Sequence, residues 1–333
     1  MPHQRERNAI QSDLRICKTN CVRFAVRVAY DGLDYHGFQS QPHGNTIQDQ
    51  IEHRLSNLLN RKVRILGCSR TDAKVHARGF VFTVDLSGEE IERLSSRRIN
   101  ECRMKLQEQE GCTREALVAK TIHSAIKQLT PQRPGSIVAR TVVPITMDFD
   151  PKFSSLWKRY SYHVACCDNH SSPFLTRYCW QMTNQQLDFD AMSHAVRIMN
   201  GKHNFEWISL VEKGEQRDPF RDLKLSIVKM EDHKQSLFDP CFANTTMYKI
   251  TGTCDFFLYK MMRRIVGIIV AVGKGEVKWP TLESCLETQD NECCRMNGSD
   301  DVSSAADSIP SALLQTAPPH GLCLEHVEYE IPI

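Results

Sequence analysis

Residues 22–32 read VRFAVRVAYDG, and this stretch indicates how the fold begins. Its larger apolar side chains stand at every second position: Val22, Phe24, Val26, Val28 and Tyr30. A period of two is typical of a half-buried β-strand, and Asp31-Gly32 supplies a turn directly after it. The sequence therefore predicts a first strand that ends at Tyr30.

Working outward, a helix is predicted next, followed by strands around a polar loop. Apolar residues recur at helical spacing from Ile47 to Leu59. Either Asn45 or Thr46 is the expected N-cap, with Gln48 as a capping-box partner of Asn45. Further expected elements are strands at 63–66, 80–86 and 137–143, a helix at 116–129 and an exposed, charged insertion at 88–114.

The second half of the chain repeats this mixture. Expected strands lie at 159–166, 223–230, 246–256 and 321–329, and expected helices at 189–199, capped by Gly201, and from Leu258 to Gly273. Residues 283–310 are rich in Asp, Glu, Ser and Asn and predict a disordered acidic loop.

These elements predict an α+β fold of two domains, residues 22–146 and 147–333, each with an antiparallel sheet and flanking helices. Residues 1–21 are expected to be a disordered basic tail or, alternatively, an organelle presequence.

The composition excludes several classes of protein. With 333 residues, 41% of them hydrophobic and 25% charged, the chain is globular rather than fibrous or disordered. Its apolar stretches are far shorter than the roughly 20 residues that a membrane-spanning helix needs. The 14 cysteines include no C-x-x-C pair and predict free thiols without a metal site. We therefore expect no membrane contact and a reducing intracellular compartment, with mitochondrion and cytoplasm both open.

The polar stretch CSRTDAKVHARG at residues 68–79 is the strongest candidate for chemistry, and Asp72 is its only carboxylate. The basic residues around it in sequence are Arg61, Lys62, Arg64, Arg70, Lys74 and Arg78. Nearby cations stabilise an ionised carboxylate, so Asp72 would be a nucleophile or an ion-pair partner rather than an acid. Alternatively, Asp72 pins the loop through backbone N–H groups. The cations would also suit a phosphate clamp.

Two further segments could converge on this loop. Tyr160 and Tyr162 share a face of a predicted strand, where a nucleic-acid base could stack; the alternative is a tyrosine pair in the core. Arg263 lies off the apolar stripe of a predicted helix, where it would either pair with a carboxylate of the other half or be solvated.

Several short motifs follow one another in a specific order. They are Tyr30-Asp31-Gly32, Tyr35-His36-Gly37-Phe38-Gln39, Arg70-Thr71-Asp72, Val75-His76-Ala77, Arg159-Tyr160-Ser161-Tyr162, Gly201-Lys202-His203-Asn204-Phe205, Met262-Arg263-Arg264-Ile265-Val266-Gly267 and Ala317-Pro318-Pro319-His320-Gly321-Leu322. Their order resembles the TruA family of tRNA pseudouridine synthases, from about Arg23 to Tyr329. The forms around Asp72 and Arg263 look most similar to the animal pseudouridine synthase-like 1 branch.

The resemblance implies an isomerase that converts uridine to pseudouridine in tRNA, in the anticodon stem-loop, or in another structured RNA. Asp72 would be the nucleophile, Arg70 would help to hold the flipped nucleotide, and Arg263 would orient Asp72. The residues expected to bind the substrate are Tyr160, which packs on the target base, together with Lys74, His76, Arg78, Arg159 and Lys260. The resemblance implies a central RNA-binding cleft, no cofactor and no metal; bacterial relatives are homodimers, which makes a homodimer possible here.

Two positions depart from the family pattern. The family usually has Gly where this chain has Lys74, and Lys adopts a positive φ less readily than Gly. Arg133-Pro134-Gly135-Ser136-Ile137 stands where relatives usually carry Leu-Pro-x-Asp-Ile, so an acidic residue is lost. A non-catalytic RNA-binding or RNA-folding protein is therefore an alternative, and a glycosidic-bond hydrolase is another that would need a second carboxylate near Asp72.

The formal net charge of +2 is unevenly distributed. Residues 283–307 hold seven acidic residues and one basic residue, a charge of −6, so the rest of the chain carries +8. Residues 61–78 hold six basic residues and one acidic residue, a charge of +5. An acidic segment thus masks a basic region that fits an RNA partner.

Overall fold

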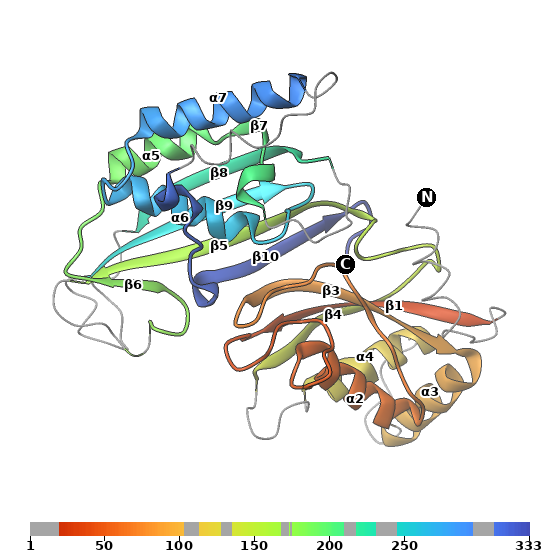
Figure 1. Cartoon of the computed structure of the whole chain (residues 1–333). Helices are drawn as coiled ribbons and strands as arrows, with labels where there is room; N and C mark the ends of the chain where they lie inside the picture. Colours follow the sequence, from red (N-terminus) through yellow and green to blue (C-terminus); the bar gives the residue numbers. More distant parts are fainter. Residues whose placement is uncertain are drawn as a thin grey trace.

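The computed structural model describes residues 20–102, 113–127, 135–167, 173, 175–209, 218–230, 245–295 and 310–333. Two groups of helices pack on a twisted sheet, one group on each half of it (Figure 1). Among the described residues, no helix combines the length and the apolar character that crossing a membrane requires.

The first half of the chain alternates strands with helices. Its strands are β1 (Cys21–Tyr30), β2 (Leu66–Gly67), β3 (His76–Ser87) and β4 (Ile137–Ile145), and its helices are α2 (Ile47–Leu59), α3 (Gly88–Cys102) and α4 (Arg114–Lys127). Strand β1 lies between β3 and β4 and is antiparallel to both. Its alternate residues Phe24, Val26 and Val28 are fully buried, as the period of two predicts.

Helix α2 begins at one of the two predicted caps. Thr46 is the N-cap: its Oγ1 accepts a hydrogen bond from the Asp49 backbone N–H at 3.1 Å and donates to Asp49 Oδ2 at 2.6 Å. The alternative pairing of Asn45 with Gln48 is wrong, because Gln48 Nε2 donates to Glu52 Oε1 instead. The exchange between Thr46 and Asp49 satisfies one of the free N–H groups of the first turn.

The second half contributes the remaining elements. Its strands are β5 (Ser155–Cys167), β6 (Trp180–Thr183), β7 (Gly201–Asn204), β8 (Phe220–Met230), β9 (Thr245–Cys254) and β10 (Leu322–Tyr329), and its helices are α5 (Phe189–Ile198), α6 (Met261–Gly273) and α7 (Trp279–Arg295). Every residue of α6 is buried except Arg263 and Arg264. A Cβ atom on Gly267 would lie 2.1 Å from the Gln315 carbonyl oxygen. Glycine is therefore needed in this helix so that the segment leading to β10 can pack against it.

The strands of both halves form one sheet in the order β4-β1-β3-β10-β5-β9-β8-β7, with β2 paired to β3 and β6 paired to β5. The halves join where β10 lies parallel to β3, with Cys323 opposite His76 and Leu324 opposite Ala77. The α+β class is confirmed. The antiparallel strands predicted for two separate domains belong to one sheet, joined at the parallel pair of β3 and β10. The domain boundaries stay a prediction. The junction lies next to the start of β3, just after the loop that carries Asp72.

Two segments expected to be irregular contain helices. Residues 88–102 of the predicted insertion form α3, and its Ile91 and Leu94 are 6% and 2% exposed, so this part is not an exposed insertion. Residues 283–295 of the predicted acidic loop belong to α7, where Leu286 is buried. A few apolar residues at helical spacing outweigh the polar composition in both cases. Residues 103–112 and 296–309 of these segments, and the basic tail up to residue 19, lie outside the described residues.

Candidate active site

Asp72 lies in the loop of residues 68–75, between β2 and β3. The loop is shorter than predicted because β3 begins at His76 rather than at Phe80. Within it, the Val75 backbone N–H donates to the Asp72 carbonyl oxygen at 3.2 Å and closes a tight turn. Thr71 is 7% exposed, and its hydroxyl lies 2.8 Å from the hydroxyl of Tyr30 at the end of β1. These contacts fix the backbone on both sides of Asp72.

The motifs after β1 form the wall behind this loop. The Phe38 backbone N–H donates to the Thr71 carbonyl oxygen at 3.1 Å. A Cβ atom on Gly37, where φ is +93°, would lie 2.9 Å from that same oxygen, and one on Gly32 would lie 1.9 Å from the Val75 carbonyl oxygen. Only glycine permits such close approach at these two positions. The glycines of the sequence motifs thus set the position of the loop.

Lys74, where the family usually has glycine, adopts the left-handed conformation that glycine adopts more readily than lysine. Its φ is +67°, and its backbone N–H donates to the Tyr35 carbonyl oxygen at 3.3 Å. In a residue other than glycine, this backbone conformation costs roughly 1 kcal/mol or more of free energy. The loop therefore keeps the glycine-type backbone and places an exposed cation two residues from Asp72.

The Asp72 carboxylate is held by an arginine from the other half of the chain. Arg263 Nη1 donates to Asp72 Oδ2 at 2.7 Å, and the two side chains are 13% and 23% exposed. Arg263 is itself fixed, since its Nε donates to the Ala317 carbonyl oxygen at 2.8 Å while the Ala317 N–H donates to the Arg263 carbonyl oxygen at 3.0 Å. The expected pairing of Arg263 with a carboxylate is present, through one N–H group. The guanidinium donates a charged hydrogen bond at this distance and restricts the orientation of the carboxylate.

Tyr160 of β5 lies on the same side of the sheet as this ion pair. Its ring is 7% exposed and packs edge-on against Phe257, with the centroids 4.9 Å apart. Its hydroxyl lies 3.4 Å from Ser69 Oγ in the Asp72 loop. Burial raises the pKa of Tyr160, and the nearby negative charge of Asp72 adds to the rise, so the phenol stays neutral at physiological pH.

Two of the predicted basic residues lie in the Asp72 loop, and a third lies at the start of the helix that carries Arg263. Arg70 and Lys74 are exposed members of the loop itself. Lys260 is the N-cap of α6, with a φ of +58°, three residues before Arg263. Its ammonium group lies 5.1 Å from the centroid of the Tyr259 ring. In the described part of the chain, no group of three or more His, Cys, Asp or Glu side chains is arranged to hold a metal ion.

Arg78 and Arg159, which are predicted to bind the substrate, point to the face of the sheet opposite Tyr160. Leu324 lies opposite both Ala77 and Tyr160 in the sheet, so these three side chains share the Tyr160 face. Arg78 and Arg159 are sequence neighbours of Ala77 and Tyr160, and therefore face the other way. Consistent with this, Arg78 lies 3.5 Å from Glu325, which accepts a hydrogen bond from Ser161 at 2.5 Å.

Arg159 occupies the same opposite face. Its guanidinium lies 5.0 Å from the Trp157 ring, and its Nε lies 3.4 Å from Thr253 Oγ1. Strand alternation separates neighbours in sequence onto two faces, so a run of basic residues does not make one surface.

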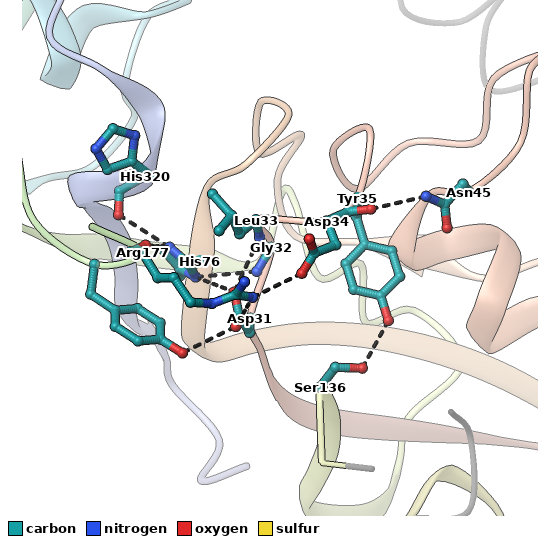
Figure 2. Close-up of polar contacts among 11 residues, drawn as sticks. Asp31, Gly32, Leu33, Asp34, Tyr35, Asn45, His76, Ser136, Arg177 and His320 are labelled. Carbon is teal, nitrogen blue, oxygen red and sulfur yellow. Dashed lines mark hydrogen bonds and ion pairs between the residues drawn. The ribbon is translucent and has the colours of Figure 1, made fainter. Parts of the chain in front are cut away.

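His76 is 6% exposed, and both of its ring nitrogens have partners inside the protein (Figure 2). Nε2 lies 2.9 Å from the Arg177 carbonyl oxygen and 3.1 Å from that of His320. Nδ1 lies 3.2 Å from the Gly32 backbone nitrogen and 3.1 Å from Asp31 Oδ1. Both ring nitrogens therefore have partners within the protein, and the predicted contact of His76 with the substrate stays a prediction.

Ser136 occupies the place where the family pattern has an acidic residue. It is 9% exposed, and its hydroxyl lies 2.8 Å from the hydroxyl of Tyr35. Its carbonyl oxygen accepts a hydrogen bond from the Asp31 N–H at 2.9 Å. The serine therefore holds the Asp31–Phe38 segment without a charge. Arg133 and Pro134 lie outside the described residues.

Several residues of the site were not predicted from the sequence: Ser69, Phe257, Ala317 and Arg177. Ala317 belongs to a motif that the sequence analysis named, without a role, and Phe257 lies three residues before Lys260. Arg177 carries no sequence signal, because its segment has no periodicity and its partners are 143 to 146 residues away.

The chain is similar in sequence to several known proteins. A family model described as tRNA pseudouridine synthase matches residues 195–330. A tRNA pseudouridine synthase A from Exiguobacterium is 28% identical over 309 residues, covering 92% of this chain and 98% of the relative. Another, from Thermodesulfovibrio yellowstonii, is 28% identical over 313 residues, covering 92% of this chain and 100% of the relative. A tRNA pseudouridine synthase A 2 from Clostridium perfringens is 27% identical over 305 residues, with 91% and 98% covered.

The mixed α and β architecture is consistent with the pseudouridine synthase fold, and the homologues indicate that the chain belongs to the isomerases. Over more than nine-tenths of its length, the chain is similar to bacterial proteins named tRNA pseudouridine synthase A.

Proposed function

We propose that this protein converts uridine to pseudouridine in tRNA, with Asp72 as the nucleophile. The observation that carries the proposal is the ion pair between Asp72 and Arg263, 2.7 Å long and formed between residues 191 positions apart. Only an ionised carboxylate can act as a nucleophile, and the charged hydrogen bond from Arg263 fixes the orientation of the Asp72 carboxylate.

The reaction is an isomerisation in which atoms balance without a co-reactant. The bond between N1 of the base and C1′ of the ribose breaks while Asp72 attacks, and the detached base turns. A bond then forms between C5 and C1′; the proton at C5 leaves, N1 gains a proton, and the carboxylate is released. Arg263 engages Oδ2, which leaves Oδ1 as the oxygen that approaches the substrate.

A uridine inside a stem or a structured loop must leave its stack before a side chain can reach it, at a cost of a few kcal/mol. Tyr160, held by Phe257 beside Asp72, offers an aromatic edge and face against which the extruded base can pack. Arg70 is exposed in the same loop and is placed to hold the flipped nucleotide by its phosphate.

The proposed substrate is tRNA, in its anticodon stem-loop. The relatives named above carry tRNA in their names. Lys74, Arg70 and Lys260 supply cations around Asp72 that suit a folded, phosphate-rich ligand. Action as a homodimer, location in mitochondria and membership of the animal pseudouridine synthase-like 1 branch remain parts of the proposal.

Incubation of the purified protein with tRNA transcripts, followed by mapping of pseudouridine, tests the activity. We expect the wild type to form pseudouridine and Asp72→Ala to bind the same tRNA without forming it. Asp188→Asn is the control, since Asp188 caps α5 and lies outside this site.

Three outcomes would contradict the proposal. Turnover by Asp72→Ala would exclude this nucleophile. Tight binding by the wild type without any pseudouridine would favour the non-catalytic RNA-binding protein, and release of free uracil would favour hydrolysis. Mapping all pseudouridines in RNA from cells that lack the protein identifies the target position.

A further inference from the structure

Asp31, His76 and Arg177 come from three separate parts of the chain and meet beside the Asp72 loop (Figure 2). Asp31 follows β1, His76 begins β3, and Arg177 lies shortly before β6. His76 Nδ1 lies 3.1 Å from Asp31 Oδ1, and Arg177 Nη2 donates to Asp31 Oδ2 at 2.7 Å. These three residues are named the positioning cluster below.

The His76 ring contacts both halves of the chain. On one side, Nδ1 meets Asp31 and the Gly32 backbone N–H of the first half. On the other, Nε2 lies within 3.1 Å of the carbonyl oxygens of Arg177 and His320 in the second half. The ring is therefore a link between the halves at the place where β3 and β10 run side by side.

The same ring is connected to both partners of the Asp72–Arg263 ion pair. Toward Asp72, the path is four residues of chain that include the tight turn from Asp72 to Val75. Toward Arg263, the path is the segment 317–320: Ala317 exchanges two hydrogen bonds with Arg263, and the His320 carbonyl oxygen reaches His76. The hydroxyl of Tyr162 donates to the Pro318 carbonyl oxygen at 2.7 Å and holds that segment between them.

Charged hydrogen bonds hold the side chains of the positioning cluster together. Burial raises the pKa of the Asp31 carboxyl, but hydrogen bonds from His76 and Arg177 outweigh it and hold the pKa well below the usual range. Arg177 Nη2 also donates to Asp34 Oδ2 at 2.8 Å, and Tyr178 donates its hydroxyl to Asp31 Oδ2 at 3.1 Å. The side chains of Asp31 and Arg177 are 22% and 32% exposed, so these charged hydrogen bonds are partly shielded from water.

We propose that Asp31, His76 and Arg177 are positioning residues that set the distance between the Asp72 loop and the segment holding Arg263. This inference rests on the proposed function and adds to it residues that touch neither Asp72 nor Arg263 directly. Displacing reacting groups by about 1 Å lowers the reaction rate on the order of 100-fold. A link between the Asp72 loop and the segment that holds Arg263 should therefore affect mainly the rate of the chemical step.

Asp31→Asn and Asp85→Asn form a matched pair of variants. Both aspartates are 22% exposed, and both accept a hydrogen bond from an arginine, Arg177 at 2.7 Å and Arg23 at 2.6 Å. Asp85 lies within the first half, on β3, whereas Asp31 binds across the halves. We expect Asp31→Asn to lower kcat for pseudouridine formation about 10- to 100-fold with little change in KM, and Asp85→Asn to leave both unchanged.

Arg177 supplies a second test of the same link. Arg177→Gln should behave as Asp31→Asn does. Arg177→Lys should recover part of kcat, because an ammonium keeps the charge but loses the fixed fork that reaches both Asp31 and Asp34. The double variant Asp31→Asn/Arg177→Gln should be no slower than either single one, because the two residues share one interaction.

Hydrogen exchange separates this inference from the proposed function. We expect Asp31→Asn, and not Asp85→Asn, to speed exchange of the backbone N–H groups of Val75 and Ala317, which form the turn at Asp72 and the contact with Arg263. Unchanged exchange at both amides would overturn the positioning role even in an active enzyme. An inactive wild type with the expected exchange pattern would overturn the proposed function alone. Equal losses of kcat in Asp31→Asn and Asp85→Asn would overturn the positioning role, because they would show that the cluster contributes only to the stability of the fold.

Discussion

Arg263 donates to Asp72 across 191 positions of sequence, and each of the two residues is held from behind by a different segment. The Asp72 loop rests on the glycine-containing segment after β1, and Arg263 rests on Ala317 before β10. The ion pair therefore forms only when the two halves of the sheet are correctly joined. The ion pair of Asp72 therefore depends on the tertiary fold as a whole.

The first prediction concerns the orientation of Asp72. Arg263→Gln should lower kcat by about 100-fold with little effect on the affinity for tRNA, because it removes the group that orients the carboxylate. Arg263→Lys should have a kcat between those of the wild type and Arg263→Gln, since a lysine cannot also make the Nε contact to Ala317. Single-turnover kinetics and filter binding measure the two effects separately.

Arg264→Gln is the matched control, because Arg264 is the only other residue of α6 that is not buried. It should keep kcat. Equal losses in Arg263→Gln and Arg264→Gln would show that helix stability, and not orientation of Asp72, explains the result.

The second prediction concerns the backbone strain at Lys74. Glycine adopts a φ of +67° without the penalty that lysine pays, but it also makes the unfolded chain more flexible. Lys74→Gly should therefore raise the free energy of unfolding by about 0.5 kcal/mol, whereas Lys74→Ala should leave it nearly unchanged. Both variants should bind tRNA more weakly at low salt because both lose the cation.

Urea unfolding and salt-dependent binding check these opposite effects. A clear loss of stability in Lys74→Gly would mean that the lysine side chain stabilises the loop by contacts that outweigh its strain.

The elements with strong periodicity are predicted from the residues alone, since strand β1 and helix α6 carry repeating apolar patterns. The residues leave Arg263 either paired with a carboxylate or solvated, and its pairing with Asp72 is implied only by the resemblance to a family. Helix α3 is not predicted because, among its side chains that the structure describes, Ile91 and Leu94 are the buried apolar ones among many charged residues.

The faces of residues near the sheet junction were harder to predict. Arg78 and His76 follow Asp72 closely in sequence and were assigned to the same surface. Their positions depend on where β3 begins and on its pairing with β10. This pairing joins distant parts of the chain, since Arg78 and its contact Glu325 are 247 residues apart in sequence. Such pairings leave no local trace in a single sequence, and neither does the contact of Arg177 with Asp31.

The third prediction concerns pH and His163, on the face opposite Asp72. Burial lowers the pKa of His163 to about 4, with Lys249 and Arg78 adding to the shift and Glu325 opposing it. In the unfolded chain a histidine has a pKa of about 6.5, so the unfolded state takes up the proton first. Stability should therefore fall as the pH drops from about 6.5 to 4, by up to about 1.4 kcal/mol per pH unit, and this contribution should be constant above and below that range.

His163→Gln should remove this part of the pH dependence, whereas His43→Gln, at an exposed loop position, should retain it. Urea unfolding at pH 7, 5.5 and 4.5 measures the difference. Parallel curves for the wild type and His163→Gln would contradict the lowered pKa.

The last prediction compares two exposed arginines that the sequence places eight residues apart and the sheet places on different faces. Arg70 lies in the Asp72 loop, whereas the Arg78 side chain, 67% exposed, lies beside Glu325 on the other face. Arg70→Glu should weaken tRNA binding and reduce the slope of log K against log salt by about 1, since one phosphate contact is lost. Arg78→Glu removes the same charge and should leave both the affinity and the slope nearly unchanged. If Arg78→Glu weakened binding as strongly as Arg70→Glu, the RNA would have to contact both faces of the sheet, and a single binding surface around Asp72 would be excluded.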